Sequence, residues 1–93
     1  NKKPKQYYQM IAKIKTPVFI DALTFELAAP LNASLRAILR DDKGCECSRL
    51  ETHMPYSERT LTWKGLNDLP YGVYTLELSQ GEDEMKMRLV KRV

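Results

Sequence analysis

The chain has 93 residues, a formal net charge of +3, 43% hydrophobic residues and 29% charged residues. This length suits one domain over residues 1–93, and the composition is typical of an ordered globular chain, which excludes a disordered one. No run of about 18 apolar residues occurs, so we expect no membrane insertion. Residues 1–6 include three lysines and are expected to form a flexible N-terminal tail.

Apolar and polar residues alternate along much of the chain. The apolar positions of the successive runs are Tyr8, Met10, Ala12 and Ile14; Leu23, Phe25 and Leu27; Leu61 and Trp63; Tyr74, Leu76 and Leu78; and Met85, Met87 and Leu89. A sheet with one face on a core and the other in water needs this period of two. The pattern therefore predicts a β-strand at each run.

Turn-forming residues separate the runs. They lie at Pro17, residues 30–32, residues 41–44, Pro55, residues 67–70 and residues 80–82. Gly44 and Gly81 suit hairpins, because glycine adopts the left-handed conformation readily. Seven short segments at this spacing predict an all-β, seven-strand antiparallel sandwich.

The segment 33–40 fits two structures. Asn32 is able to cap a helix over Ala33–Arg40, in which Leu35, Ile38 and Leu39 would share a face. Leu35, Ala37 and Leu39 also alternate as a strand requires. The turn residues that follow at 41–44 favour the strand, and the helix stays open as the alternative.

Two aromatic residues are predicted to be structural. Trp63 lies in an alternating run, and we expect it to fill the centre of the core. Tyr74 follows Gly72 by two positions. We expect its ring to pack inward and its hydroxyl group to bond the backbone near a strand corner.

The sequence offers little chemistry for catalysis or metal binding. His53 is the only histidine, and no motif orders a nucleophile or carboxylate around it, so we predict that the protein is not an enzyme. Cys45 and Cys47 would face the same side of a strand, and with His53 they are candidate soft metal ligands. No fourth ligand has zinc-finger spacing, so two reduced thiols are the preferred interpretation, and no cofactor is expected.

The charges and the aromatic residues bear on two binding roles. Basic residues gather at both ends of the chain without interleaved aromatic residues, so we expect no nucleic-acid binding. A carbohydrate platform needs several aromatic side chains exposed together, and Tyr7, Tyr8, Tyr56 and Tyr71 are the candidates. Scattered tyrosines near strand ends are more often structural, so this remains an alternative.

Several segments resemble a known type of Ig-like module. They are residues 16–18 with 21–27, residues 33–41 with 43–44, residues 65–78, which read GLNDLPYGVYTLEL, and residues 86–91. The pattern is similar to the C-terminal sorting domains of type IX secretion substrates in Bacteroidetes. It is also similar to the Ig-like module of flagellar hook-capping proteins, where a Trp-x-Gly like that of residues 63–65 precedes the turn. The resemblance implies a non-catalytic Ig-like or fibronectin-III-like sandwich.

We therefore expect an extracytoplasmic bacterial module with a protein-interaction, accessory or secretion-sorting role. We expect a periplasmic, cell-surface or secreted location. A small metal- or redox-responsive module and a carbohydrate-binding module are the alternatives. The expected interaction surface comprises Lys86, Arg88, Lys91, Arg92 and Tyr71, because basic side chains facing outward on the closing strand would select an acidic protein partner.

Overall fold

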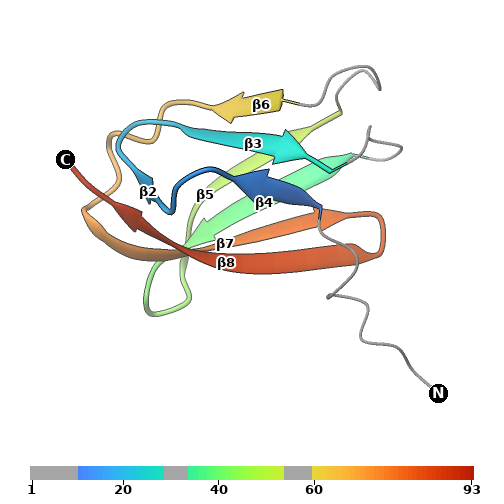
Figure 1. Ribbon diagram of the computed structural model, residues 1–93. Coiled ribbons are helices and arrows are strands. Elements are labelled where there is room, and N and C mark those ends of the chain that lie inside the picture. The colour runs from blue at the N-terminus through green and yellow to red at the C-terminus, as the bar shows by residue number, and fades with distance from the viewer. Residues whose placement is uncertain (1–10, 29–33, 54–59) are drawn as a thin grey trace.

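Two β-sheets lie against each other in the computed structural model, which describes residues 11–28, 34–53 and 60–93 (Figure 1). The strands are β1 (Ala12–Ile14), β2 (Val18–Phe19), β3 (Leu23–Leu27), β4 (Leu35–Arg40), β5 (Glu46–Thr52), β6 (Thr60–Trp63), β7 (Gly72–Gln80) and β8 (Asp83–Lys91). The described residues contain no helix, and hence none that would cross a membrane. The all-β prediction is confirmed.

The smaller sheet has three strands in the order β1-β3-β6, all antiparallel. Leu23, Phe25 and Leu27 of β3 are buried, while Thr24 and Glu26 between them are exposed. Cross-strand partners share a face, so Leu61 and Trp63 of β6 join the apolar side of the sheet. The outward side is polar. The alternation that predicted these strands is confirmed.

The larger sheet has five strands in the order β2-β8-β7-β4-β5. Its two longest strands, β7 and β8, form a hairpin that Gly81 closes with a φ of 61°. β4 pairs antiparallel with both β7 and β5, so segment 35–40 is a central strand. The strand interpretation of that segment is confirmed over residues 35–40, while Ala33 lies outside the described residues.

The first strand divides between the two sheets. β1 pairs with β3 in one sheet, and after residues 15–17 the chain continues as β2, which pairs with β8 in the other. Proline has no amide hydrogen for a sheet ladder and sits best at strand ends and edges, so Pro17 marks the crossing. The β2–β8 pair is parallel. The described residues therefore hold eight strands and one parallel pair instead of seven antiparallel strands.

The core fills the space between the inner faces of the two sheets. Phe25, Leu35, Leu39, Leu66, Leu76, Leu78 and Leu89 are its largest fully buried side chains. Trp63 is only 5% exposed, so its predicted burial in the core is confirmed. Met85 and Met87 of β8 are half-buried and pack on the rim of this cluster. Burial of these side chains is the main stabilising contribution in a domain of this size.

The hairpin between β4 and β5 is fixed by its own polar groups. The Asp41 carboxylate accepts hydrogen bonds from the Lys43 and Cys45 amides, both at 2.9 Å. Gly44 has a φ of 87°, as the turn prediction requires. The hydrogen bond from the Cys45 amide is the main reason that the pKa of Asp41 is lowered, with Lys43 contributing through its amide and its charge.

Candidate interaction surface

The outer face of the larger sheet carries every ion pair found among the described residues. The strand positions between the buried residues of β4, β7 and β8 point to this face, and they hold arginine, lysine and glutamate. The pairs are Arg36–Glu51, Arg40–Glu77, Arg49–Glu46, Arg49–Glu51 and Lys86–Glu77. Three of these pairs join neighbouring strands, and the two pairs of Arg49 lie within β5.

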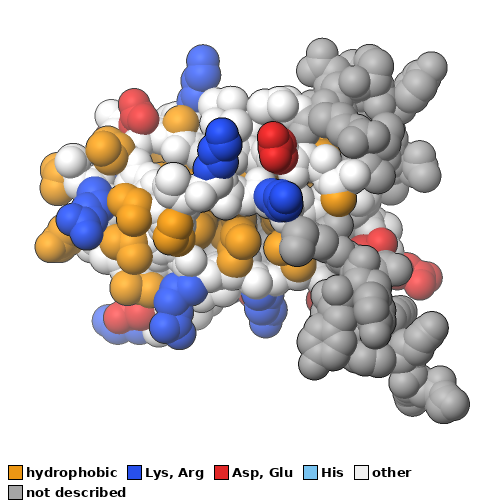
Figure 2. Space-filling view, in the orientation of Figure 1, with side chains coloured by type: hydrophobic (Ala, Val, Ile, Leu, Met, Phe, Trp, Pro, Cys, Tyr) orange, Lys and Arg blue, Asp and Glu red, His pale blue; other side chains and the backbone are white. Residues whose placement is uncertain are grey.

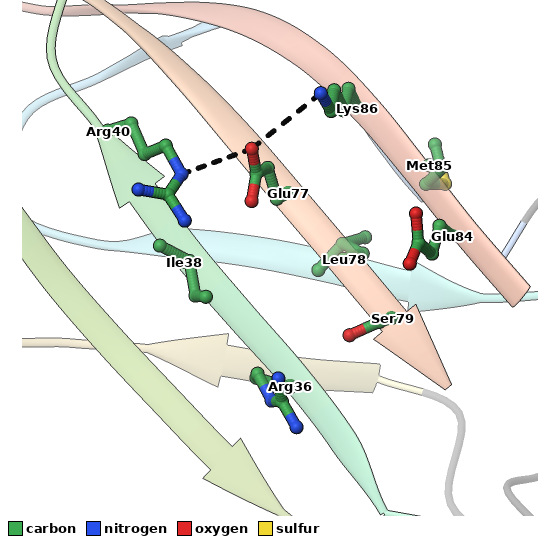
Figure 3. Close-up of a pocket in the computed structure, with 9 residues that line it drawn as sticks. All are labelled: Arg36, Ile38, Arg40, Glu77, Leu78, Ser79, Glu84, Met85 and Lys86. Carbon is green, nitrogen blue, oxygen red and sulfur yellow. Dashed lines mark ion pairs between the residues drawn. The ribbon is translucent and has the colours of Figure 1, made fainter. Parts of the chain in front are cut away.

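Glu77 occupies the centre of this charged region (Figure 3). Its Oε2 lies 3.1 Å from Arg40 Nε and 3.8 Å from Lys86 Nζ. The three side chains surround a shallow hollow of about 170 Å³. Ile38 lies beside them on the same face and is 7% exposed, because long charged side chains cover it with their apolar stems. The hollow is therefore lined by charges that already satisfy one another.

A second group of charges lies on the edge strand β5. Arg49 donates two hydrogen bonds to Glu46, at 3.0 and 3.1 Å, and one to Glu51 at 3.1 Å. The Arg49 hydrogen bond is the largest cause of the lowered pKa of Glu46, and the same pairing raises the pKa of Arg49. These side chains are exposed, so their ion pairs restrict side-chain conformations at the surface but contribute little to the free energy of unfolding.

Arg88 differs from the other basic residues on the outer face of β4, β5 and β8, each of which forms an ion pair. It is exposed, and the described residues contain no ion pair to it. Its cross-strand neighbour on β7 is Thr75. The sequence prediction placed Arg88 and Lys86 on the outward side of β8, and both are exposed there. Arg88 is thus available to an external anion, whereas Lys86 shares Glu77 with Arg40.

A row of three valines follows Arg88 along the same face. Val90 of β8 lies between Val18 of β2 and Val73 of β7 in the sheet register. Val18 is 42% exposed and Val73 is 45% exposed. Ile20, just after β2, and Tyr71, just before β7, are 53% and 69% exposed. Large exposed apolar side chains are therefore concentrated at one end of the sheet. We call these five residues and the flanking Arg88 and Arg92 the valine patch.

Lys91 does not belong to this surface, although it was expected to face outward. It is only 3% exposed. Its strand neighbour Leu89 is buried on the inner face, and two residues along a strand point to the same side. The Lys91 stem is thus buried, and its Nζ donates a hydrogen bond to the Arg92 carbonyl oxygen at 2.9 Å. Lys91 is therefore a basic residue at an inner-face position of β8. The overall basic composition of the strand does not reveal this.

The proposed metal ligands are not brought together. Cys45 and Cys47 are exposed free thiols at one end of β5, and His53 follows its other end. Cys47 and His53 are six positions apart along an extended strand, which separates them by about 20 Å. The described residues contain no group of three metal-ligating side chains. β5 is an edge strand, and both cysteine side chains are exposed.

The four tyrosines that are candidates for a carbohydrate-binding platform divide into two groups. Tyr71 is exposed in the valine patch, while Tyr7, Tyr8 and Tyr56 lie outside the described residues. The sequence prediction therefore located Arg88, Arg92 and Tyr71 in one region. It missed Val18, Ile20, Val73 and Val90, because their proximity arises from pairing between distant segments, including the parallel contact of β2 with β8.

Comparison with known proteins finds no matching family model and no curated protein of significant similarity.

Proposed function

We propose that this domain is a non-catalytic, Ig-like interaction module that binds an acidic protein partner through the valine patch. The observation that carries the proposal is the coincidence of the exposed apolar side chains with Arg88, an exposed cation that forms no ion pair with the described residues. Apolar patches rimmed by polar residues are characteristic of protein-binding surfaces. Arg88 and Arg92 would select a partner with carboxylates around an apolar contact.

Two features support the Ig-like assignment. The strand orders β1-β3-β6 and β2-β8-β7-β4-β5 resemble the two sheets of an Ig-like sandwich whose first strand is shared between them. Tyr74, near the start of β7, bonds the backbone a few residues upstream, as the tyrosine corner of such domains does. The extracytoplasmic location and the accessory or secretion-sorting role rest on the sequence resemblance described above.

The test compares two patch variants with a control on the opposite sheet. Val73→Glu places an acidic group in the valine row, and Arg92→Glu reverses a flanking charge. Thr62→Glu adds the same charge to the outer face of β6, where Thr62 is exposed. Immobilised wild-type and variant domains are presented to secreted and periplasmic proteins of the native host, and any retained protein is purified for titration against each variant.

The proposal expects an acidic protein that the wild type and Thr62→Glu bind equally and that both patch variants bind at least about tenfold more weakly, since a central interface residue contributes more than about 1 kcal/mol. Chemical-shift changes on titration should centre on Val73 and Val90. Equal affinity of all four proteins for every purified partner would refute the proposal.

A further inference from the structure

We propose that the open edge of β8 is a second binding site, which accepts an extended peptide segment whose apolar residues alternate with acidic ones. This site goes beyond the valine patch, because it uses the backbone edge and the inner face of β8. It also lies at a different end of the strand from the valine row.

The edge is open because β2 is short. β7 lies beside β8 from Asp83 to Lys91, whereas β2 covers the opposite side only at Val90 and Lys91. In the described part of the chain, no strand lies on that side of residues 83–89. The crossing at Pro17 takes the preceding residues to the other sheet, so β1 does not fill this place.

The backbone groups along this edge face outward at alternate residues. The Val90 amide donates to the Pro17 carbonyl at 2.7 Å, which shows that its N–H points away from β7. Amide and carbonyl groups alternate sides along a strand, so those of Glu84, Lys86 and Arg88 point the same way. The described residues provide them with no backbone partner on that side. Such a row is a template for an added strand.

An apolar cleft lies beside the open edge. It has a volume of about 430 Å³, and its apolar lining comes from Ala12 and Ile14 of β1 and from Met85 and Met87 of β8. Figure 2 shows hydrophobic side chains gathered in a band between the two sheets on this side of the molecule. Methionine side chains adapt to different apolar partners. The cleft is therefore suited to apolar side chains of a segment bound at the edge.

The sheet register specifies the chemistry of that segment. Side chains of paired residues in neighbouring strands point to the same face. Residues of the segment opposite Met85 and Met87 would thus enter the cleft and should be apolar. Residues opposite Lys86 and Arg88 would lie on the outer face, where carboxylates are favoured. Lys13, Lys15 and Glu26 also line the cleft, so its charged lining carries a net positive charge.

A second copy of the chain meets one like-charge contact at this edge. Two antiparallel β8 strands paired about Lys86 would place the two Lys86 side chains opposite each other, which is destabilising, while each Glu84 would lie opposite Arg88 of the other copy. A separate segment with carboxylates opposite both Lys86 and Arg88 avoids the lysine–lysine contact, and it is the occupant that charge complementarity favours.

The first experiment titrates the full chain with synthetic peptides. The binding probe is the acetylated, amidated peptide Glu-Val-Glu-Val-Glu-Val-Glu. The controls are the same peptide with lysine for glutamate, and the acidic peptide with N-methylated amides at alternate residues, which cannot complete the ladder. We expect the acidic peptide to bind about tenfold tighter than the lysine peptide. Its binding should protect the amides of Glu84, Lys86 and Arg88 from hydrogen exchange.

Protein variants separate this site from the valine patch. The variant Lys86→Glu, which lies outside the valine patch, should reduce the preference for the acidic peptide, and Met87→Glu should weaken binding of the acidic peptide. Val73→Glu should leave that binding unchanged even if it abolishes partner binding at the patch. Because Met87→Glu is able to perturb folding, the methylated peptide provides the independent check.

Three outcomes would overturn the site: equal binding of the acidic, basic and methylated peptides; amide protection confined to other strands; or elution of the free chain as a dimer whose β8 amides are already protected.

Discussion

Tyr74 and Pro70 are joined by a hydrogen bond of 2.6 Å, from the phenolic Oη to the carbonyl oxygen. Tyr74 is 3% exposed, and its ring meets Phe19 edge-on at a centroid distance of 6.2 Å. The same side chain therefore ties the turn before β7 to the core and to β2. Tyr71 and Val73 flank this point, so the bond also fixes one side of the valine patch. The sequence prediction for Tyr74 is confirmed in both of its parts.

Tyr74→Phe should lower the free energy of unfolding by about 1–2 kcal/mol, because the Pro70 carbonyl loses its donor while the ring stays in place. Urea unfolding of the wild type and the variant measures the difference. Tyr71→Phe is the matched control, since Tyr71 is 69% exposed and should change stability little. Equal losses in both variants would show that the Tyr74 hydroxyl has no special role.

Alkaline pH should weaken the fold through the same residue. Burial is the main cause that raises the pKa of Tyr74 above its ordinary value of about 10. The unfolded chain then releases this proton at a lower pH than the folded protein does. The stabilising contribution is complete below about pH 10 and is lost as the pH rises through the folded pKa. Urea unfolding between about pH 8 and about pH 11 should show a steeper decline for the wild type than for Tyr74→Phe. Parallel declines would contradict this assignment.

The sequence predicted the structure correctly where the signal lies within one short segment. The alternation of Leu23, Phe25 and Leu27 predicted an inner face, and Gly44 and Gly81 predicted hairpin turns, because both signals are local. β5 carries no regular alternation of apolar residues, since it is an edge strand with one weakly buried side. β2 has two residues and gives no periodic signal at all. Its parallel contact with β8 depends on the crossing at Pro17, which a local pattern does not reveal.

Of the residues in the proposed binding surfaces, the sequence predicted the charged ones and Tyr71. Arg88 and Arg92 stood out in the sequence, but the valines that accompany them look like ordinary strand residues. Their exposure follows from the sheet register, which aligns Val18, Val90 and Val73 on the outer face. The open edge beside residues 83–89 is likewise a property of strand order. A binding surface made from backbone and from cross-strand neighbours has no signature in a single segment.

Variants of Lys91 test whether this basic residue of β8 stabilises the core. Lys91→Ala should lower the free energy of unfolding by about 2 kcal/mol, at roughly 0.8 kcal/mol for each buried methylene group removed. Lys91→Met keeps most of the stem and should stay within about 1.5 kcal/mol of the wild type. Both variants should bind an acidic partner as the wild type does. If fully folded Lys91→Met lost partner binding, Lys91 would be part of the interaction surface and its purely structural role would be contradicted.

Cys47 should react slowly with thiol reagents although it is exposed. Desolvation is the main cause that raises its pKa, and the charge of Asp41 adds to it. The sulfur also lies 3.4 Å from the Cys45 carbonyl oxygen, to which it donates. The thiolate is the reactive species, so a raised pKa leaves less of it near neutral pH. In the variant Cys45→Ser, labelling of Cys47 should be slower at about pH 8 than labelling of an unstructured cysteine peptide. Asp41→Asn should accelerate the labelling of Cys47, because it removes a negative charge that raises the pKa of the thiol. Labelling as fast as the peptide would contradict the raised pKa.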